Sequence, residues 1–186
     1  TIAIFKTQTE KLAMVKGINL ARAKEIAEEF NEKWETWQLV SFLERFGISS
    51  ANSKKVYDAL GANAIAQIEE NPYILIDITY GVDFKKIDRM AMQLGLPYNS
   101  DKRIESGIKY SLIGASSNGH TCVMKQNLIH HVTELLDVQT EDVQNSLINL
   151  RGKQEIVIEK QTEEEWVYLS PFYKAEQNIA EKLKLL

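Results

Sequence analysis

Apolar residues in the first half of the chain recur at intervals of three and four, the spacing that places them along one side of a helix. Between residues 9 and 30 this spacing is interrupted at Gly17, which predicts two short helices joined by a turn. Further helices are predicted at residues 36–46, 50–60, 62–70, 73–78 and 84–94. Glycine and proline mark their ends, because neither residue continues a helix easily. No strand-like alternation of polar and apolar residues interrupts this half.

The second half of the chain mixes helical and strand patterns. Helices are predicted at residues 103–116, 125–136, 141–151 and 171–186. A short β-like segment occupies residues 120–123, and residues 155–159 and 166–169 alternate as in a hairpin whose tip is 160–165. Helix, short strand, helix, helix and hairpin is the order expected of a winged-helix domain. We therefore predict a small α+β winged-helix-like domain with one β-hairpin over residues 98–186, ending in a helix that would lead into a further domain.

Three glycine-containing turns separate helices in the first half, and their flanks follow the helix-hairpin-helix pattern. That motif places apolar residues before a Gly-apolar-Gly turn, then a small residue and another apolar one. The first turn fits best, with Leu12, Val15, Gly17, Ile18, Ala23 and Ile26 at those positions. The fold class that we predict is mainly α, with a tandem helix-hairpin-helix domain over residues 1–97.

The residue at the second glycine position of the motif differs in all three turns. Asn19 takes it in the first turn and tolerates left-handed backbone geometry, so that turn is retained. The Asn19 side chain would either obstruct or supplement a phosphate contact. Ser49 takes the position in the second turn and Asp83 in the third. Because Asp83 puts an anion where a phosphate would bind, we expect the third turn to bind poorly.

These turns suit phosphate because the first amides of a helix have no partner within it and the helix dipole favours a negative charge there. Nearby cations would supplement the amides. The predicted DNA-binding residues are Gly17, Asn19, Arg22, Lys24, Gly47, Ser49, Lys54, Lys55, Gly81, Lys85 and Lys86. The alternative is that such turns only pack helices together, as many do in all-α proteins.

The charge of the chain limits how it could bind nucleic acid. Its 186 residues hold 22 Lys and Arg against 26 Asp and Glu, a formal net charge of −4. Up to Pro97 the count is 12 cations against 13 anions, and after it 10 against 13. Tight non-specific binders are usually strongly basic, so DNA contact here must be local. The same charge favours the rival interpretation, an acidic docking module.

Composition also bears on location. A single cysteine, Cys122, excludes an internal disulfide and fits a reducing cytoplasm, and no apolar run reaches membrane-spanning length. The chain starts at Thr1, and apolar residues continue to Leu186, which we interpret as a segment of a longer protein. Processing of a short protein is the alternative.

No set of residues predicts catalysis or a cofactor in this segment. The chain has no P-loop and no carboxylate pair suited to acid–base chemistry. His120, His130 and His131 lack the partners and spacing of a metal site, since adjacent histidines on a helix cannot face one ion. Trp166 could stack on a base from the predicted hairpin. The run Glu163–Glu165 at the tip would repel phosphate and indicates a surface that faces protein.

Several segments in order resemble the N-terminal region of RecD/TraA-type DNA helicases. The most specific run extends from Asn71-Pro72-Tyr73 through Gly81-Val82-Asp83-Phe84-Lys85-Lys86-Ile87 to Asp88-Arg89. The other matching segments are Phe42-Leu43, Phe46-Gly47-Ile48, Leu94-Gly95-Leu96, Arg103, Gly107, Gly119-His120-Thr121, Val167-Tyr168-Leu169, Tyr173-Lys174-Ala175-Glu176 and Ile179-Ala180. The resemblance covers almost the whole chain.

This resemblance implies a non-catalytic, DNA-binding accessory region of a helicase whose motor domain lies in the same protein and moves 5′ to 3′ on single-stranded DNA. ATP and Mg²⁺ are expected for that motor and no cofactor for this segment. The implied partners are single-stranded or junction DNA and the motor in cis, with no membrane and a cytoplasmic location. The turns would hold the DNA backbone without sequence specificity. The alternative function is a docking module that positions or regulates the motor.

Overall fold

The computed structural model describes residues 2–79 and 82–185, together with the side chains of these residues except 2, 3 and 6. The chain divides into two compact units, Thr1–Met90 and Ala91–Leu186, and the division falls inside a helix. Within the described residues, no helix is long and apolar enough to cross a membrane.

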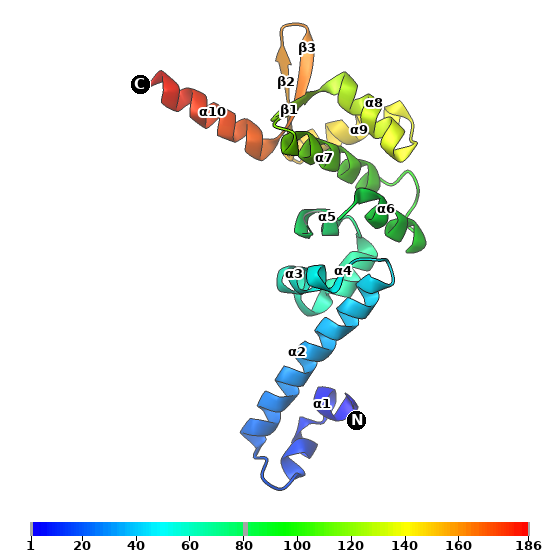
Figure 1. Cartoon of the computed structure of the whole chain (residues 1–186), viewed down its shortest axis with the longest axis vertical. Helices are drawn as coiled ribbons and strands as arrows, with labels where there is room; N and C mark the ends of the chain where they lie inside the picture. Colours follow the sequence, from blue (N-terminus) through cyan, green and yellow to red (C-terminus); the bar gives the residue numbers. More distant parts are fainter. Residues whose placement is uncertain (1, 80–81, 186) are drawn as a thin grey trace. The chain divides into compact units, whose positions relative to one another are not determined.

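Unit 1 is entirely helical over its described part (Figure 1). Its elements are α1 Ile2–Thr7, the 3₁₀ helix η1 Thr9–Met14, α2 Leu20–Glu44, α3 Ser50–Leu60, the 3₁₀ helix η2 Gly61–Asn63, α4 Ala64–Glu70, α5 Ile74–Ile78 and α6 Phe84–Gln93, which continues past the division. The mainly helical fold predicted for this half is therefore confirmed.

The long helix α2 corrects one prediction. The pattern indicated a helix ending near Phe30 and a second one at 36–46, but the structure has one continuous helix of 25 residues. No glycine or proline lies between Phe30 and Thr36, so nothing in the backbone stops the helix there. Phe30 and Trp34 stack along it, with ring centroids 6.1 Å apart. The N-terminal segment is also 3₁₀ rather than α over Thr9–Met14.

The core of unit 1 gathers the apolar faces of α2 to α6. Its members with at most 2% of their surface exposed include Leu39, Leu43, Ile48, Val56, Ile68, Leu75, Phe84, Ile87 and Met90. Tyr73 and Phe84 stack across α5 and α6, and the Tyr73 hydroxyl donates to Asp88 Oδ1 at 2.6 Å. These contacts hold α5 and the start of α6 to one core, to which Ile48 of the turn at residues 45–49 also belongs.

Unit 2 contains a small antiparallel sheet among helices (Figure 1). Its elements are α7 Asp101–Ser117, β1 Cys122–Met124, α8 Lys125–Leu136, α9 Thr140–Gly152, β2 Ile156–Gln161, β3 Glu164–Leu169 and α10 Ser170–Lys184. The strand order is β1-β3-β2, with Val167 opposite both Val123 and Ile158. The predicted hairpin is confirmed, and its tip is shorter than expected because β2 and β3 extend to Gln161 and Glu164.

Helices α7 and α8 approach closely at Gly107. A Cβ added there would lie 2.8 Å from Leu136 Cδ1, so only glycine fits without a shift of the leucine. Arg103, one turn earlier, is 4% exposed and donates from Nη1 to the carbonyl oxygens of Tyr98 and Leu136. Its guanidinium also lies over the Tyr98 ring. The segment before α7 is thereby fastened to the end of α8.

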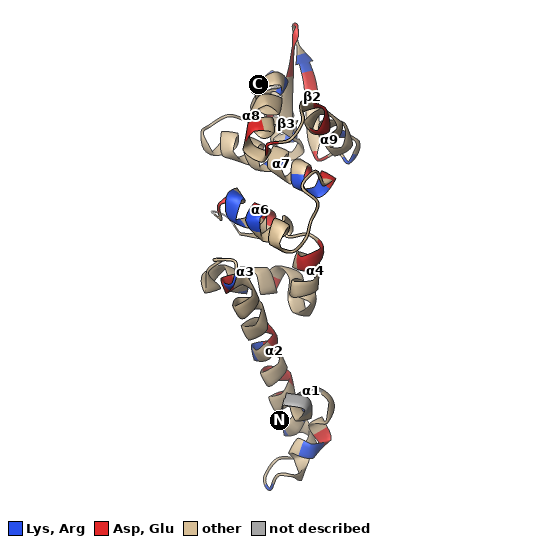
Figure 2. Ribbon diagram, turned by 90° about the vertical axis from the view of Figure 1, so that its right-hand side faces the viewer, with Lys and Arg blue, Asp and Glu red and all other residues tan. Residues whose placement is uncertain are grey.

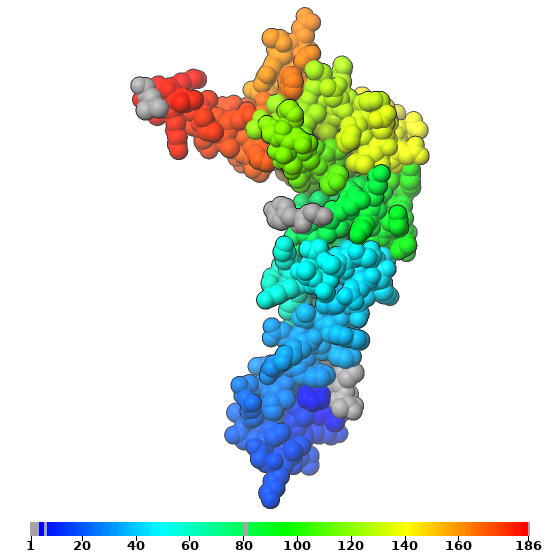
Figure 3. Space-filling view, in the orientation of Figure 1, coloured from blue at the N-terminus to red at the C-terminus, as the bar shows by residue number. Residues whose placement is uncertain are grey.

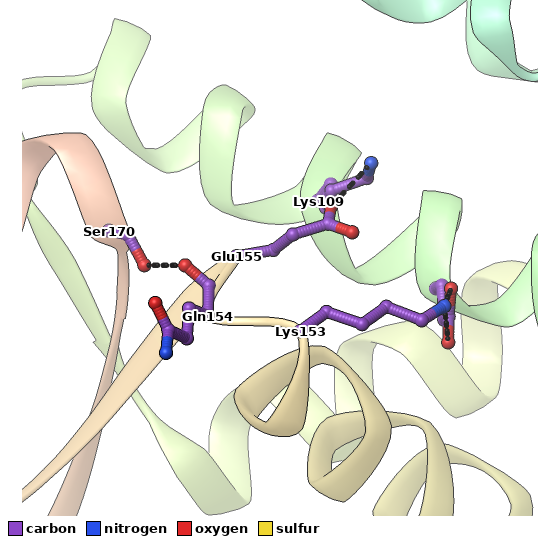
Figure 4. A network of polar contacts seen from close by, with 6 residues as sticks. Lys109, Lys153, Gln154, Glu155 and Ser170 are labelled. Atoms are coloured by element: carbon purple, nitrogen blue, oxygen red, sulfur yellow. Dashed lines mark hydrogen bonds and ion pairs between the residues drawn. The ribbon is translucent and has the colours of Figure 1, made fainter.

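A polar network joins α7 to the connection between α9 and β2 (Figure 4). The Lys153 ammonium donates to both carboxylate oxygens of Glu105, at 2.8 and 2.6 Å, and Glu105 is 8% exposed. This hydrogen bonding raises the pKa of Lys153. Lys109 pairs with Glu155 at 2.9 Å. The Ser170 hydroxyl donates to the Gln154 carbonyl oxygen, so the same connection holds the start of α10.

We expect Lys153→Met to lower the free energy of unfolding by about 1–2 kcal/mol, because it leaves the Glu105 carboxylate buried without its cation. The cost stays below that of a fully buried pair since the Lys153 side chain is 52% exposed. Urea unfolding of the whole chain followed by circular dichroism measures it. Lys33→Met removes an exposed pair with Glu29 and is the matched control, expected within about 0.5 kcal/mol of wild type. Equal losses in the two variants would contradict a stabilising role for the network.

Candidate nucleic-acid interface

The second turn reverses the chain between α2 and α3 through a left-handed glycine. Gly47 has φ +73°, which costs little without a Cβ. The Ile48 amide donates to the Leu43 carbonyl oxygen at 3.1 Å and the Gly47 amide to that of Glu44 at 2.9 Å, the paired bonds of a Schellman motif. Ile48 is 2% exposed, so its side chain fastens the turn to the core.

The first amides of α3 are unpaired at the surface of this turn. Ser49 precedes the helix in an extended conformation, and its side chain makes no capping hydrogen bond. The Asn52 amide donates to the Ser49 carbonyl oxygen. Among the described residues, none accepts a hydrogen bond from the amides of Ser50 and Ala51, and both residues are exposed. Together with the helix dipole, these amides can bind an anionic oxygen.

Three lysines surround this helix start or reach it. Lys54 and Lys55 are exposed about one turn further along α3. Lys86 comes from α6, and its ammonium lies 3.5 Å from the Gly47 carbonyl oxygen. The second and third turns therefore share a cation. Sequence reasoning assigned Lys86 to the third turn alone, because 39 residues separate the two groups and no pattern reports such a contact.

The third turn has fewer amides available to an anion than the second turn has. Gly81 lies outside the described residues. The Lys85 amide donates to Asp83 Oδ1 at 3.1 Å, so the carboxylate that the sequence placed at this position occupies one of the first amides of α6. Figure 2 shows the basic residues of α6, and Lys85, Lys86 and Arg89 are exposed there. This turn offers ammonium groups rather than free amides.

The first turn differs from a helix-to-helix hairpin because the 3₁₀ helix η1 precedes it. Gly17 is left-handed, with φ +94°. Asn19 caps α2, since its side-chain oxygen accepts from the Arg22 amide at 2.8 Å. Arg22 also pairs with Glu25 at 2.6 Å, and this pairing raises the pKa of Arg22. Lys24 is exposed, and Ile18 is half-buried rather than a core residue.

The structure does not bring all the predicted residues together. The first and second turns lie at opposite ends of α2, whose 25 residues span about 37 Å at 1.5 Å per residue. The first turn therefore forms a separate surface, while the second and third meet at Lys86 and Gly47. One phosphate cannot contact both ends of α2.

Unit 2 presents an acidic hairpin tip. Glu163, Glu164 and Glu165 are exposed, and Glu165 pairs with Lys125 at 2.7 Å, which lowers the pKa of Glu165. A cavity of about 310 Å³ lies between the tip and the start of α8. Figure 2 shows the acidic residues of this tip. Trp166 is half-buried on β3 opposite Glu159, and His120, His130 and His131 are exposed.

Comparison with known families adds one finding. Residues 32–122 match the family described as the ATP-dependent RecD2 DNA helicase HHH domain, where HHH stands for helix-hairpin-helix. The matched segment contains the second and third turns and leaves out the first. It confirms the resemblance to an N-terminal RecD-type helicase region. A domain of this family is a non-catalytic accessory part of a helicase, and its turns are associated with DNA binding.

We expect Gly47→Ala to destabilise the chain by about 1–2 kcal/mol, because a Cβ is disfavoured in left-handed backbone although no atom lies within 4 Å of it. Gly114→Ala is the matched control: Gly114 is an exposed residue of α7 with equally free space. That change should stabilise by about 0.5–1 kcal/mol, since alanine favours a helix interior. Urea unfolding of both variants measures the contrast, and a neutral Gly47→Ala would show that the turn tolerates a right-handed backbone.

Proposed function

We propose that this chain, whose residues 32–122 match the HHH domain of the ATP-dependent RecD2 DNA helicase family, is a DNA-binding accessory region that holds the sugar-phosphate backbone without reading the base sequence. The observation that carries the proposal is the start of α3, where the Ser50 and Ala51 amides have no acceptor among the described residues. Lys54, Lys55 and Lys86 supply positive charge around it.

The proposed contact is indifferent to sequence for a chemical reason. Backbone amides and ammonium groups bind phosphate oxygens, which are identical along every strand, whereas sequence is read at base edges. In this arrangement the amides of α3 hold one phosphate. The ammoniums of Lys54 and Lys55 attract its neighbours, and Lys86 moves from the Gly47 carbonyl oxygen toward the bound strand.

The other two turns have auxiliary parts in this proposal. At the third turn Lys85 and Lys86 act as point charges, because Asp83 already occupies an amide of α6. At the first turn Asn19 and Gly17 shape the backbone, and Arg22 and Lys24 supply charge. Single-stranded or junction DNA is the proposed ligand.

We further propose that unit 2 is a winged-helix-like domain. The order α7, β1, α8, α9, β2, β3 and the sheet order β1-β3-β2 support this assignment. The match to a helicase family supports a motor domain in the same protein, which we propose is driven by ATP and Mg²⁺ and acts in the cytoplasm. The residues of this chain would contribute DNA binding to that motor and no catalytic group.

A docking module that positions the motor is the second candidate function. The exposed acidic tip of the β2–β3 hairpin favours it, because a wing that inserts beside DNA would not carry three glutamates. The net charge of −4 points in the same direction. Both functions can coexist, since the acidic tip belongs to unit 2 and the proposed DNA site to unit 1.

We expect Lys54→Glu with Lys55→Glu to weaken DNA binding about tenfold or more at low salt and to reduce the slope of log affinity against log salt by about 2. The loss should be similar for unrelated sequences, because phosphates alone are contacted. Fluorescence anisotropy with labelled single-strand/duplex junctions at several salt concentrations measures both quantities.

The matched control for this test is Lys174→Glu with Lys182→Glu, which makes the same change in net charge at exposed positions of α10. It should weaken binding by less than about threefold, since non-specific charge acts through a screened field. Folded wild-type protein that gives no anisotropy change at low salt would remove direct DNA binding and leave the docking function.

We expect Asp83→Ser to strengthen DNA binding by about two- to fivefold at low salt. Serine keeps a hydroxyl that can cap α6, while the substitution removes a negative charge beside Lys85 and Lys86. The same anisotropy titration measures the change, with Glu181→Ser on the exposed surface of α10 as the control for net charge. Equal gains in both variants would show that Asp83 acts only through overall charge.

A further inference from the structure

The Gly17 turn exposes a group of large apolar side chains. Met14 is 84% exposed, Val15 53% and Leu20 50%, and all three flank the same reversal of the chain. Isolated apolar residues on a surface are ordinary, but three around one tight turn form a patch that gains free energy when it leaves water. Figure 3 shows this deep-blue segment at the molecular surface.

Cations border this patch. The segment 10–25 holds four cations, Lys11, Lys16, Arg22 and Lys24, against two carboxylates, Glu10 and Glu25, in a chain of net charge −4. Lys11, Lys16 and Lys24 are exposed, and within the described part of the chain none of them forms an ion pair. Arg22 is paired with Glu25, so three ammoniums remain available to a partner. The charge that complements them is negative.

The turn is held in a defined shape. The Ile18 amide donates to the Val15 carbonyl oxygen at 3.0 Å, across the left-handed Gly17. Asn19 caps α2 through the Arg22 amide, which fixes Leu20 as the first residue of that helix. The apolar side chains are therefore presented on a fixed turn. A fixed apolar surface loses little conformational entropy when it binds.

We infer that this turn, defined by Met14, Val15 and Leu20 with Lys11, Lys16 and Lys24 at its border, contacts the faces of unpaired bases of a nucleic acid beside a single-strand/duplex junction. The ammoniums select a polyanion, and the apolar faces of a nucleic acid are those of its bases. In a duplex the bases are paired and stacked on one another, whereas a junction has unpaired bases whose faces are accessible. The inference rests on the proposed DNA binding of unit 1 and adds a contact with unpaired bases at the Gly17 turn.

The inference differs from the backbone contact proposed for α3. Backbone binding gives no preference for a junction over a blunt duplex of equal length, because the single-stranded part of a junction carries fewer phosphates. Base contact at the Gly17 turn adds affinity only where unpaired bases are accessible. The two contributions are therefore separable by the shape of the DNA rather than by its sequence.

The experiment compares wild type with Met14→Ser/Val15→Ser/Leu20→Ser on two probes of equal length. One is a single-strand/duplex junction with 2-aminopurine at the junction, and the other is a blunt duplex. We expect the wild type to bind the junction about fivefold more tightly than the duplex, or by about 1 kcal/mol, and to raise the 2-aminopurine fluorescence as the base unstacks. The triple variant should lose the preference and the fluorescence change while keeping its affinity for the duplex.

Two controls keep this test decisive. Ile148→Ser/Leu183→Ser removes apolar side chains that are 67% and 65% exposed in unit 2 and should leave both signals unchanged. Met14→Gln alone changes the most exposed of the three side chains, so it reports on the contact even if the triple variant unfolds. It should reduce the junction preference about twofold.

The outcomes separate this inference from the proposed function. Wild type that binds both probes equally, with unchanged 2-aminopurine fluorescence, overturns base contact and leaves backbone binding intact. Wild type that binds neither probe overturns the proposed function as well. Self-association of the wild type that the triple variant abolishes, seen by size-exclusion chromatography with light scattering, would make the patch a protein interface and overturn the inference.

Discussion

The proposed DNA site depends on the way the chain turns at Gly47. Two hydrogen bonds back to the end of α2 use the amides of Gly47 and Ile48, and the buried Ile48 side chain anchors the reversal in the core. As a result, the amides that have no acceptor within the described part of the chain belong to the next helix, at Ser50 and Ala51. A glycine bend thus contributes indirectly: it completes one helix so that the following helix starts at the surface with its dipole and its donors facing solvent.

Competition for helix-start amides decides which turns can hold a phosphate. In each turn the residue before the helix has an oxygen atom in its side chain. The turns differ in whether that oxygen accepts a hydrogen bond from an amide of the helix. Asn19 and Asp83 bond to amides of their own helices, while Ser49 makes no such bond. A capping side chain already supplies the acceptor oxygen that a phosphate would otherwise supply to these amides. The carboxylate of Asp83 also repels a phosphate. Local capping therefore ranks the turns differently from motif similarity, under which the Gly17 turn ranks first.

Sequence reasoning recovered the elements that have clear stops or strict alternation. The helix at 125–136 is confirmed to the residue, and the hairpin is confirmed because strands at 155–159 and 166–169 alternate around a polar turn. The break predicted between Phe30 and Thr36 was wrong. The apolar side of the helix shifts around its axis there, and in the sequence such a shift resembles the end of a helix unless a glycine or proline is also required as a stop. The contact between Lys86 and Gly47 is set by tertiary packing, which no local pattern encodes.

The length of α2 then constrains how unit 1 could use both of its ends on one DNA molecule. A continuous helix of 25 residues is a stiff spacer of about 37 Å, and adjacent base pairs are about 3.4 Å apart along a duplex. The Gly17 turn would therefore lie about eleven base pairs from a phosphate held at Ser50, if the helix followed the duplex axis. Had the helix broken at Phe30, as the pattern indicated, no fixed distance would follow. A backbone grip at one end and a base contact at the other are compatible with a single ligand only when a junction lies about one helical turn from the gripped phosphate.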